Sequence, residues 1–225
     1  MYRDGESIFY YLTLMNENYE MPPMPEGSRE GILRGMYKLR AAGEGNGAGK
    51  AGEAGKAAGK KASLRAQLLG SGAILNEVVK AQGMLEAYGV AADVWSVTSY
   101  QELYRDGHAA ERWNRLHPTE KARVPYVTQC LGGSEGVIVA ASDYVKALPD
   151  AIDRWMPRRL TSLGTDGFGR SEGRAALRDF FEVDAKFITL ATLSALQQDG
   201  KIDGALVQKA IQDLGINPEK PNPAI

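Results

Sequence analysis

The sequence contains few of the residues that build metal and disulfide sites. Its 225 residues include one cysteine, Cys130, and two histidines, His108 and His117. A single cysteine excludes an internal disulfide and a cysteine-rich metal cluster. The two histidines are nine residues apart and lack the carboxylate–histidine spacing of a zinc site. Cys130 lies in an apolar run, where a thiol behaves as a small hydrophobic side chain, so nucleophilic catalysis by it is not expected.

The chain also lacks excess charge and long apolar runs. Its formal net charge is −1, so no overall electrostatic field favours nucleic acid or anionic lipid as a partner. No apolar run approaches the ~20 residues that span a bilayer, and the N-terminus does not have the pattern of a signal peptide. With 44% hydrophobic and 24% charged residues, the composition is typical of a globular protein of one or two domains.

The N-terminal part predicts two strands separated by prolines. Residues 8–14, Ile-Phe-Tyr-Tyr-Leu-Thr-Leu, are rich in β-branched and aromatic side chains and predict a buried strand. No earlier residues of the sequence supply a neighbouring strand, so we expect residues 8–14 to pair within a sheet from another part of the whole protein. Three prolines within residues 22–25 interrupt regular structure. Residues 31–40 predict a short strand centred on residues 36–39.

Residues 41–62 divide the chain. They are almost entirely Ala, Gly, Lys and Glu, a composition that buries too little apolar surface to offset the entropy of ordering a chain, and they predict a flexible linker. A helix is the alternative because alanine and lysine favour helices, although seven glycines between residues 41 and 61 oppose it. The expected organisation is therefore the end of one domain at residues 1–40, a linker, and a second domain at residues 63–225.

The second domain shows an alternation of strand and helix patterns. Strands are predicted at residues 64–69, 90–97, 126–131, 137–141 and 160–163, and helices at residues 74–88, 100–114, 144–155, 175–180, 186–198 and 205–214. This order predicts an α/β fold, a three-layer α/β/α arrangement around a mostly parallel sheet with right-handed crossovers.

Residues 70–72, Gly-Ser-Gly, lie between a predicted strand and a predicted helix, and Asp93 follows about twenty residues later. This placement suits a dinucleotide-binding turn, in which glycines let a pyrophosphate approach the start of a helix. However, Leu75 occupies the third position where that motif has a small residue. A tight strand-to-helix turn is the favoured interpretation, with Asp93 in or near its strand.

Residues 111–118, Glu-Arg-Trp-Asn-Arg-Leu-His-Pro, combine an acid, two arginines and an imidazole. They could form a carboxylate-binding or proton-transfer site. The favoured alternative is structural: Glu111 and Arg115 pair along a helix that ends at His117. Arg112 and His117 remain candidates for a subunit or domain interface.

Residues 165–171, Thr-Asp-Gly-Phe-Gly-Arg-Ser, form a glycine-rich loop between a predicted strand and a predicted helix. Such a loop can direct backbone N–H groups at an anion. A turn or interface loop is favoured, in which Asp166 pairs with Arg170 and Ser171 caps the following helix. Asp166 and Arg170 are kept as candidate residues.

Four phrases taken together resemble one enzyme family. They lie at residues 92–99, 111–118, 124–129 and 163–171. They are similar to the C-terminal end of the homodimeric, thiamine-diphosphate-dependent first component of the bacterial pyruvate dehydrogenase complex, a member of the transketolase-like superfamily. The resemblance runs over nearly the whole chain and is broken mainly at residues 41–62. It implies a transketolase C-terminal-domain fold for residues 63–225, preceded by the last strand of a middle, pyrimidine-binding domain.

The resemblance also implies an activity. The full-length enzyme would decarboxylate pyruvate on thiamine diphosphate and Mg²⁺ and acetylate the lipoyl group of a dihydrolipoyl acetyltransferase. Its other partners would be its own N-terminal and middle domains and a second copy in a homodimer, in a bacterial cytoplasm. The family's Gly-Asp-Gly motif for the magnesium diphosphate is not found in this sequence. By itself this chain is therefore expected to bind no cofactor and to have no catalytic residue.

The candidate site for substrate follows the first predicted strand. Transketolases read Ser-Arg-Gln-Asn there, and the arginine binds a sugar phosphate; this chain has Asn16 in its place, as suits a substrate without phosphate. Asn16, Glu17 and Asn18 are thus expected to border the active-site entrance. Two other functions stay open: a non-catalytic scaffold or regulatory module, and a nucleotide-binding α/β domain built on residues 70–72.

Overall fold

A five-stranded sheet forms the centre of the protein. The computed structural model describes residues 3–9, 11–12, 14, 17–43 and 64–225. The strands are β1 (Met36–Arg40), β2 (Leu64–Gly70), β3 (Val90–Val97), β4 (Val137–Ala141) and β5 (Leu160–Leu163), and their order in the sheet is β1-β3-β2-β4-β5. β1 is antiparallel to β3, and all other pairs are parallel. The predicted mostly parallel sheet is confirmed.

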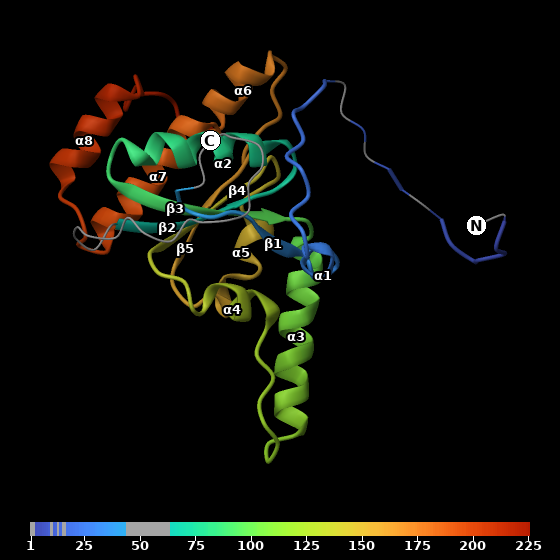
Figure 1. Ribbon diagram of the computed structural model, residues 1–225. Helices are drawn as coiled ribbons and strands as arrows, with labels where there is room; N and C mark the ends of the chain where they lie inside the picture. The colour runs from blue at the N-terminus through green and yellow to red at the C-terminus, as the bar shows by residue number, and fades with distance from the viewer. Residues whose placement is uncertain (1–2, 10, 13, 15–16, 44–63) are drawn as a thin grey trace.

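Helices cover both faces of this sheet. They are α1 (Arg29–Arg34), α2 (Leu75–Glu86), α3 (Tyr100–Leu116), α4 (Tyr126–Leu131), α5 (Ala147–Asp150), α6 (Arg174–Phe180), α7 (Ala185–Gln198) and α8 (Gly204–Asp213), with short 3₁₀ turns η1 (Gly72–Ile74) and η2 (Asp153–Trp155). Figure 1 shows α2, α6, α7 and α8 on one side of the sheet and α3, α4 and α5 on the other. This is the predicted α/β/α arrangement.

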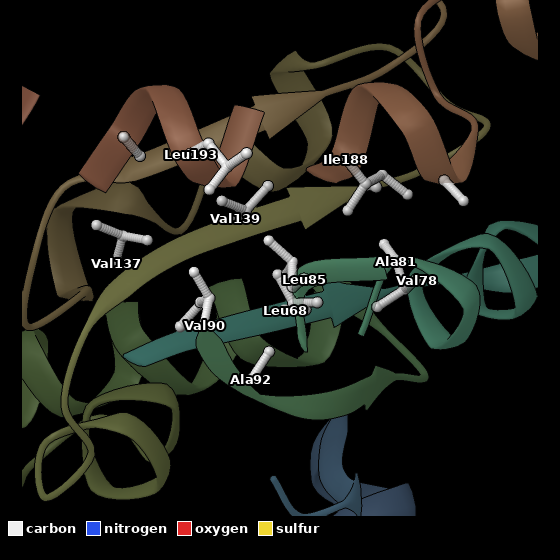
Figure 2. Packing of buried hydrophobic residues seen from close by; sticks show 14 of the residues in the cluster. Leu68, Val78, Ala81, Leu85, Val90, Ala92, Val137, Val139, Ile188 and Leu193 are labelled. Atoms are coloured by element: carbon white, nitrogen blue, oxygen red, sulfur yellow. The ribbon is translucent and has the colours of Figure 1, made fainter. Parts of the chain in front are cut away.

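Each central strand is buried on both faces. In β2, Leu68 belongs to a core shared with α2 and α7, whereas Leu69 belongs to a second core shared with α3 and α4. Both side chains are fully buried. In Figure 2, Leu68 and Val139 of the sheet lie near Ile188 of α7 in the first core. Burial on both faces explains why these strands are continuous apolar runs in the sequence.

Most predicted elements are present. The strands at residues 64–69, 90–97, 137–141 and 160–163 and the helices at residues 74–88, 100–114, 175–180, 186–198 and 205–214 differ from the structure only at their ends. Residues 36–40 are a strand, but residues 29–34 before them form helix α1. Residues 44–62 of the predicted linker lie outside the described residues.

The strand prediction for residues 126–131 is wrong, since they form helix α4. Val127 and Leu131 are buried four residues apart, which places both on the inner face of a helix. Asp106 accepts a hydrogen bond from the backbone N–H of Tyr126 at 2.5 Å and so satisfies one free donor at the start of the helix. Cys130 is consequently half-buried in a helix and not in a strand.

The described residues between 8 and 14 are extended without a strand partner among the described residues, and Phe9, Tyr11 and Leu14 are exposed. A strand here was expected to pair with a sheet from another part of the whole protein, so it stays a prediction. One further prediction needs correction. The helix predicted at residues 144–155 is reduced to α5 and η2. Its first residues form a turn in which Tyr144 accepts a hydrogen bond from the Thr165 N–H, at 2.9 Å.

Candidate functional site

The order of the strands reverses between β2 and β4. The chain leaves β2 through α2 to reach β3 on one side, then crosses to β4 on the other side of β2. In open α/β sheets, ligands bind at such a point, beyond the carboxyl ends of the strands. Here Ser71 after β2 donates a hydrogen bond to Ser142 after β4, Oγ to Oγ, at 2.9 Å. The predicted tight turn at residues 70–72 is therefore present at the switch point.

A cavity of about 360 Å³ opens beside this turn. The residues that line it come from η1, from the segments after β4 and β5, and from α6 and the segment that follows it. Its charged side chains are Asp143, Arg170, Arg174 and Arg178. We call this space the switch-point cavity.

The glycine-rich loop after β5 forms one wall of the switch-point cavity. Asp166 accepts a hydrogen bond from the Lys146 N–H at 2.9 Å, and its carboxylate lies 3.7 Å from the Lys146 Nζ. The guanidinium of Arg170 lies 5.0 Å from the centroid of the Phe180 ring. The predicted pairing of Asp166 with Arg170 is replaced by these two contacts. Ser171 is not the helix cap either, because α6 begins at Arg174 with Gly173 at the N-cap position.

The segment predicted to border the entrance lies against α6. Glu17 forms an ion pair with Arg174 at 2.8 Å. The Tyr19 hydroxyl accepts a hydrogen bond from Arg178 at 3.2 Å. Asn18 is exposed, and Asn16 lies outside the described residues. The structure thus brings Glu17 and the wall of the switch-point cavity together.

Arg112 and His117 lie elsewhere. Arg112 is on the distal part of α3 and His117 directly follows the helix, which in Figure 1 extends away from the sheet on the side opposite α6. His117 ends the helix, as predicted, and its ring stacks on Trp113 with centroids 4.4 Å apart. Glu111 contacts the Trp155 Nε1 at 2.9 Å and Arg154 at 3.0 Å, in place of the predicted pairing along the helix.

Sequence reasoning missed the residues that organise α6. Glu77 of α2 is buried, and its carboxylate accepts hydrogen bonds from Lys80 at 2.8 Å, Arg178 at 3.3 Å and the Ala185 N–H at 3.2 Å. It thereby joins α2, α6 and the start of α7. The spacing of four between Arg174 and Arg178 was a readable signal that these two share one side of a helix.

Asp93 lies inside β3 and is bound by protein groups. Its carboxylate accepts hydrogen bonds from Lys38 Nζ and the Ala42 N–H, both at 2.9 Å. Burial alone would raise its pKa, but these hydrogen bonds outweigh burial and hold the pKa of Asp93 below its ordinary value. This arrangement supports the structural interpretation of Asp93 over a role as a ribose ligand.

Metal clusters and membrane-spanning helices are both absent from the described residues. Among them, no group of three or more His, Cys, Asp or Glu side chains has the arrangement needed to hold a metal ion. A helix of the length and apolar character needed to cross a membrane was not found in the same part of the chain.

A family model, described as the transketolase-like TK C-terminal domain, matches residues 56–184. The chain belongs to this family. The matched residues contain β2, β3, β4 and β5, so this C-terminal domain includes the parallel part of the sheet and the turns that form the switch point.

Curated relatives match nearly the whole chain. The chain is 48% identical over 225 residues to the pyruvate dehydrogenase E1 component of Pseudomonas aeruginosa, and the match covers 99% of this chain and 24% of that protein. It is 44% identical over 222 residues to the pyruvate dehydrogenase E1 component of Escherichia coli K12, covering 98% and 23%. The chain thus spans about a quarter of the length of these relatives and corresponds to their C-terminal part.

Among solved structures, a transketolase from Leishmania mexicana is similar at 15% identity and a TM-score of 0.47, over 75% of this chain and 19% of that one. The relatives do not favour the two other functions, a scaffold module or a nucleotide-binding domain.

Proposed function

We propose that this chain is the C-terminal part of a pyruvate dehydrogenase E1 component. The whole enzyme decarboxylates pyruvate and passes the acetyl group to the lipoyl group of a dihydrolipoyl acetyltransferase. The observation that carries this proposal is the 48% identity to such a protein across 99% of the chain. In the proposed enzyme, residues 1–40 are the end of the middle domain and residues 63–225 form the C-terminal domain. Residues 41–62 are the linker between these two domains.

The proposal assigns thiamine diphosphate and Mg²⁺ to other domains of the enzyme. The described residues do not fit the group: no set of His, Cys, Asp or Glu side chains among them could hold its metal ion. Of the Asp-Gly pairs, Asp106 is occupied by the Tyr126 N–H and Asp166 by Lys146. We therefore derive no catalytic step from this chain.

In this proposal, the C-terminal part stabilises the homodimer and shapes the active-site entrance. The enzyme acts in the bacterial cytoplasm, and neither a membrane nor a nucleic acid is a partner. Asn16, Glu17 and Asn18 border the active-site entrance in this proposal, and the ion pair of Glu17 with Arg174 supports it because that contact fixes the segment to the C-terminal domain. Arg112 and His117 are proposed for a subunit or domain interface, since α3 projects from the sheet.

A domain exchange tests the function. The matching quarter of the Pseudomonas aeruginosa pyruvate dehydrogenase E1 component is replaced by this chain, and pyruvate-dependent reduction of ferricyanide is measured. We expect the hybrid to keep activity within about tenfold, because divergent cores of matched patterning still fold. As a control, the hybrid with Val139→Asp should be inactive, since that side chain is 1% exposed in the core. A folded hybrid that does not decarboxylate pyruvate would contradict the proposal.

The same hybrid tests the entrance residues. Asn16→Arg places a cation where pyruvate has no phosphate to meet it, and we expect a higher KM for pyruvate or slower acetylation of the lipoyl domain. Glu20→Gln, an exposed residue four positions later, is the control. Unchanged kinetics for Asn16→Arg and for Asn16→Ala would remove residues 16–18 from the entrance.

A further inference from the structure

Two glycine-containing segments that are far apart in the sequence meet at the switch-point cavity. The turn at residues 70–72 leads into η1 on one side, and the loop at residues 164–171 forms the other wall. Either segment alone is read most simply as a turn. Ala73 and Ile74, directly after the turn, and the loop line a cavity of about 360 Å³ at the place where sheets of this kind bind ligands.

One buried oxygen in the cavity has no donor. Oδ1 of Asp143, after β4, is buried and receives no hydrogen bond from any described residue. A Cβ added to Gly72 would lie 3.3 Å from this oxygen, so the glycine keeps space open next to it. Because buried polar atoms almost always have a hydrogen-bond partner, this oxygen points to a ligand that carries a donor.

The charged lining of the cavity is mainly cationic. Three guanidinium groups, those of Arg170, Arg174 and Arg178, line it together with the single carboxylate of Asp143. Glu17 pairs with Arg174 and Glu77 with Arg178, whereas the contact described for Arg170 is the Phe180 ring. Arginine is suited to phosphate because its planar fork of N–H donors matches the phosphate oxygens.

We propose that the switch-point cavity binds a small phosphate monoester that carries a hydroxyl group. The phosphate lies against Arg170 and Arg174, and the hydroxyl donates to Asp143 Oδ1. The volume is near the lower limit of ligand pockets, about 300 Å³, so the ligand is a small metabolite and not a dinucleotide. Binding is a property of this chain alone, so the proposal does not depend on pyruvate dehydrogenase activity.

Binding should also act on the N-terminal segment. Arg174 pairs with Glu17 at 2.8 Å, so an incoming phosphate competes with that carboxylate for the same guanidinium. Removing the charge of Glu17 should therefore tighten binding. If residues 16–18 border the active-site entrance as proposed above, the ligand would regulate that entrance by releasing Glu17.

Calorimetric titration of the 225-residue chain with glycerol 3-phosphate tests the site. Sulfate is the probe without a donor, and glycerol is the probe without a charge. We expect glycerol 3-phosphate to bind, sulfate to bind about tenfold more weakly, and glycerol not to bind. No binding of glycerol 3-phosphate at millimolar concentration, or equal binding of sulfate, would overturn the proposal.

Three variants locate the binding. Arg170→Gln should weaken binding of glycerol 3-phosphate about tenfold or more, Asp143→Asn should abolish its preference over sulfate, and Glu17→Gln should tighten it severalfold. Arg170 and Glu17 are exposed, so the fold should survive both changes, which circular dichroism checks.

Arg159→Gln is the control variant, because Arg159 is a surface arginine that contacts Gln198 outside the cavity. It should keep the affinity of the unmodified chain. Equal weakening by Arg159→Gln and Arg170→Gln would mean non-specific attraction and would overturn the site.

Discussion

Trp155 packs against the backbone of Gly107. A Cβ atom at Gly107 would lie 2.5 Å from Cδ2 of the indole, closer than any relaxed contact. The indole N–H donates to Glu111 one turn further along α3, at 2.9 Å. These contacts join α3 to the segment before β5 and fix the direction in which α3 leaves the sheet.

Gly107→Ala should destabilise the protein even though alanine favours helices. The added methyl group forces the indole of Trp155 from its place, and overpacking of this kind costs about 1–3 kcal/mol. Gly83→Ala in α2 is the matched control, because nothing lies within 4 Å of its Cβ position. That change should raise the free energy of unfolding by about 0.5–1 kcal/mol. Urea unfolding measures both, and a stabilising Gly107→Ala would show that the indole does not pack there.

The carboxylate of Asp93 should make stability depend on pH in acid. Its pKa in the folded protein is below the ordinary value of 3.8. As pH falls, this side chain therefore binds a proton in the unfolded chain before it does so in the folded protein. The stabilisation is present above that value and is lost as pH falls through the folded pKa.

Urea unfolding between pH 5 and pH 2 tests this. We expect the free energy of unfolding to fall less steeply for Asp93→Asn than for the unmodified chain. Lys38→Met, which removes one of the hydrogen bonds responsible, should also flatten the curve. Parallel curves for all three proteins would contradict the assignment.

Cys130 should react slowly. Burial raises the pKa of its thiol, and the thiolate is the reactive form. Because Cys130 is the single cysteine of the chain, modification by a thiol reagent reports on it alone. At pH 8 we expect the folded chain to react at least about tenfold more slowly than the chain in urea. Equal rates would mean that α4 does not protect the thiol.

The sequence predicted the strands buried on both faces and the helices that cross between them, because long apolar runs and helical spacing are local signals. It failed at residues 126–131, where six residues are too few to separate a buried strand from a buried helix by composition. The strand at residues 8–14 stays a prediction, because it was expected to pair with a sheet from another part of the whole protein.

The switch-point cavity had its signal in two places that no local pattern connects. The turn at residues 70–72 and the loop at residues 164–171 were each recognisable, yet their meeting follows from the strand order β2-β4-β5. Asp143 had no motif at all. The ion pair of Glu17 with Arg174 joins residues more than 150 positions apart, and only the folded chain brings them together.

Glu77 should be the costliest carboxylate of α2 to neutralise. It is 6% exposed and accepts hydrogen bonds from Lys80, Arg178 and the Ala185 N–H. Glu77→Gln keeps the shape but removes the charge that these donors share, and hydrogen bonds to a charged group contribute about 1.5–3 kcal/mol. We expect a loss of about 2 kcal/mol in the free energy of unfolding, measured in urea. Glu86→Gln, an exposed position of the same helix, should cost far less. Equal losses for the two variants would show that Glu77 does not hold α2, α6 and α7 together.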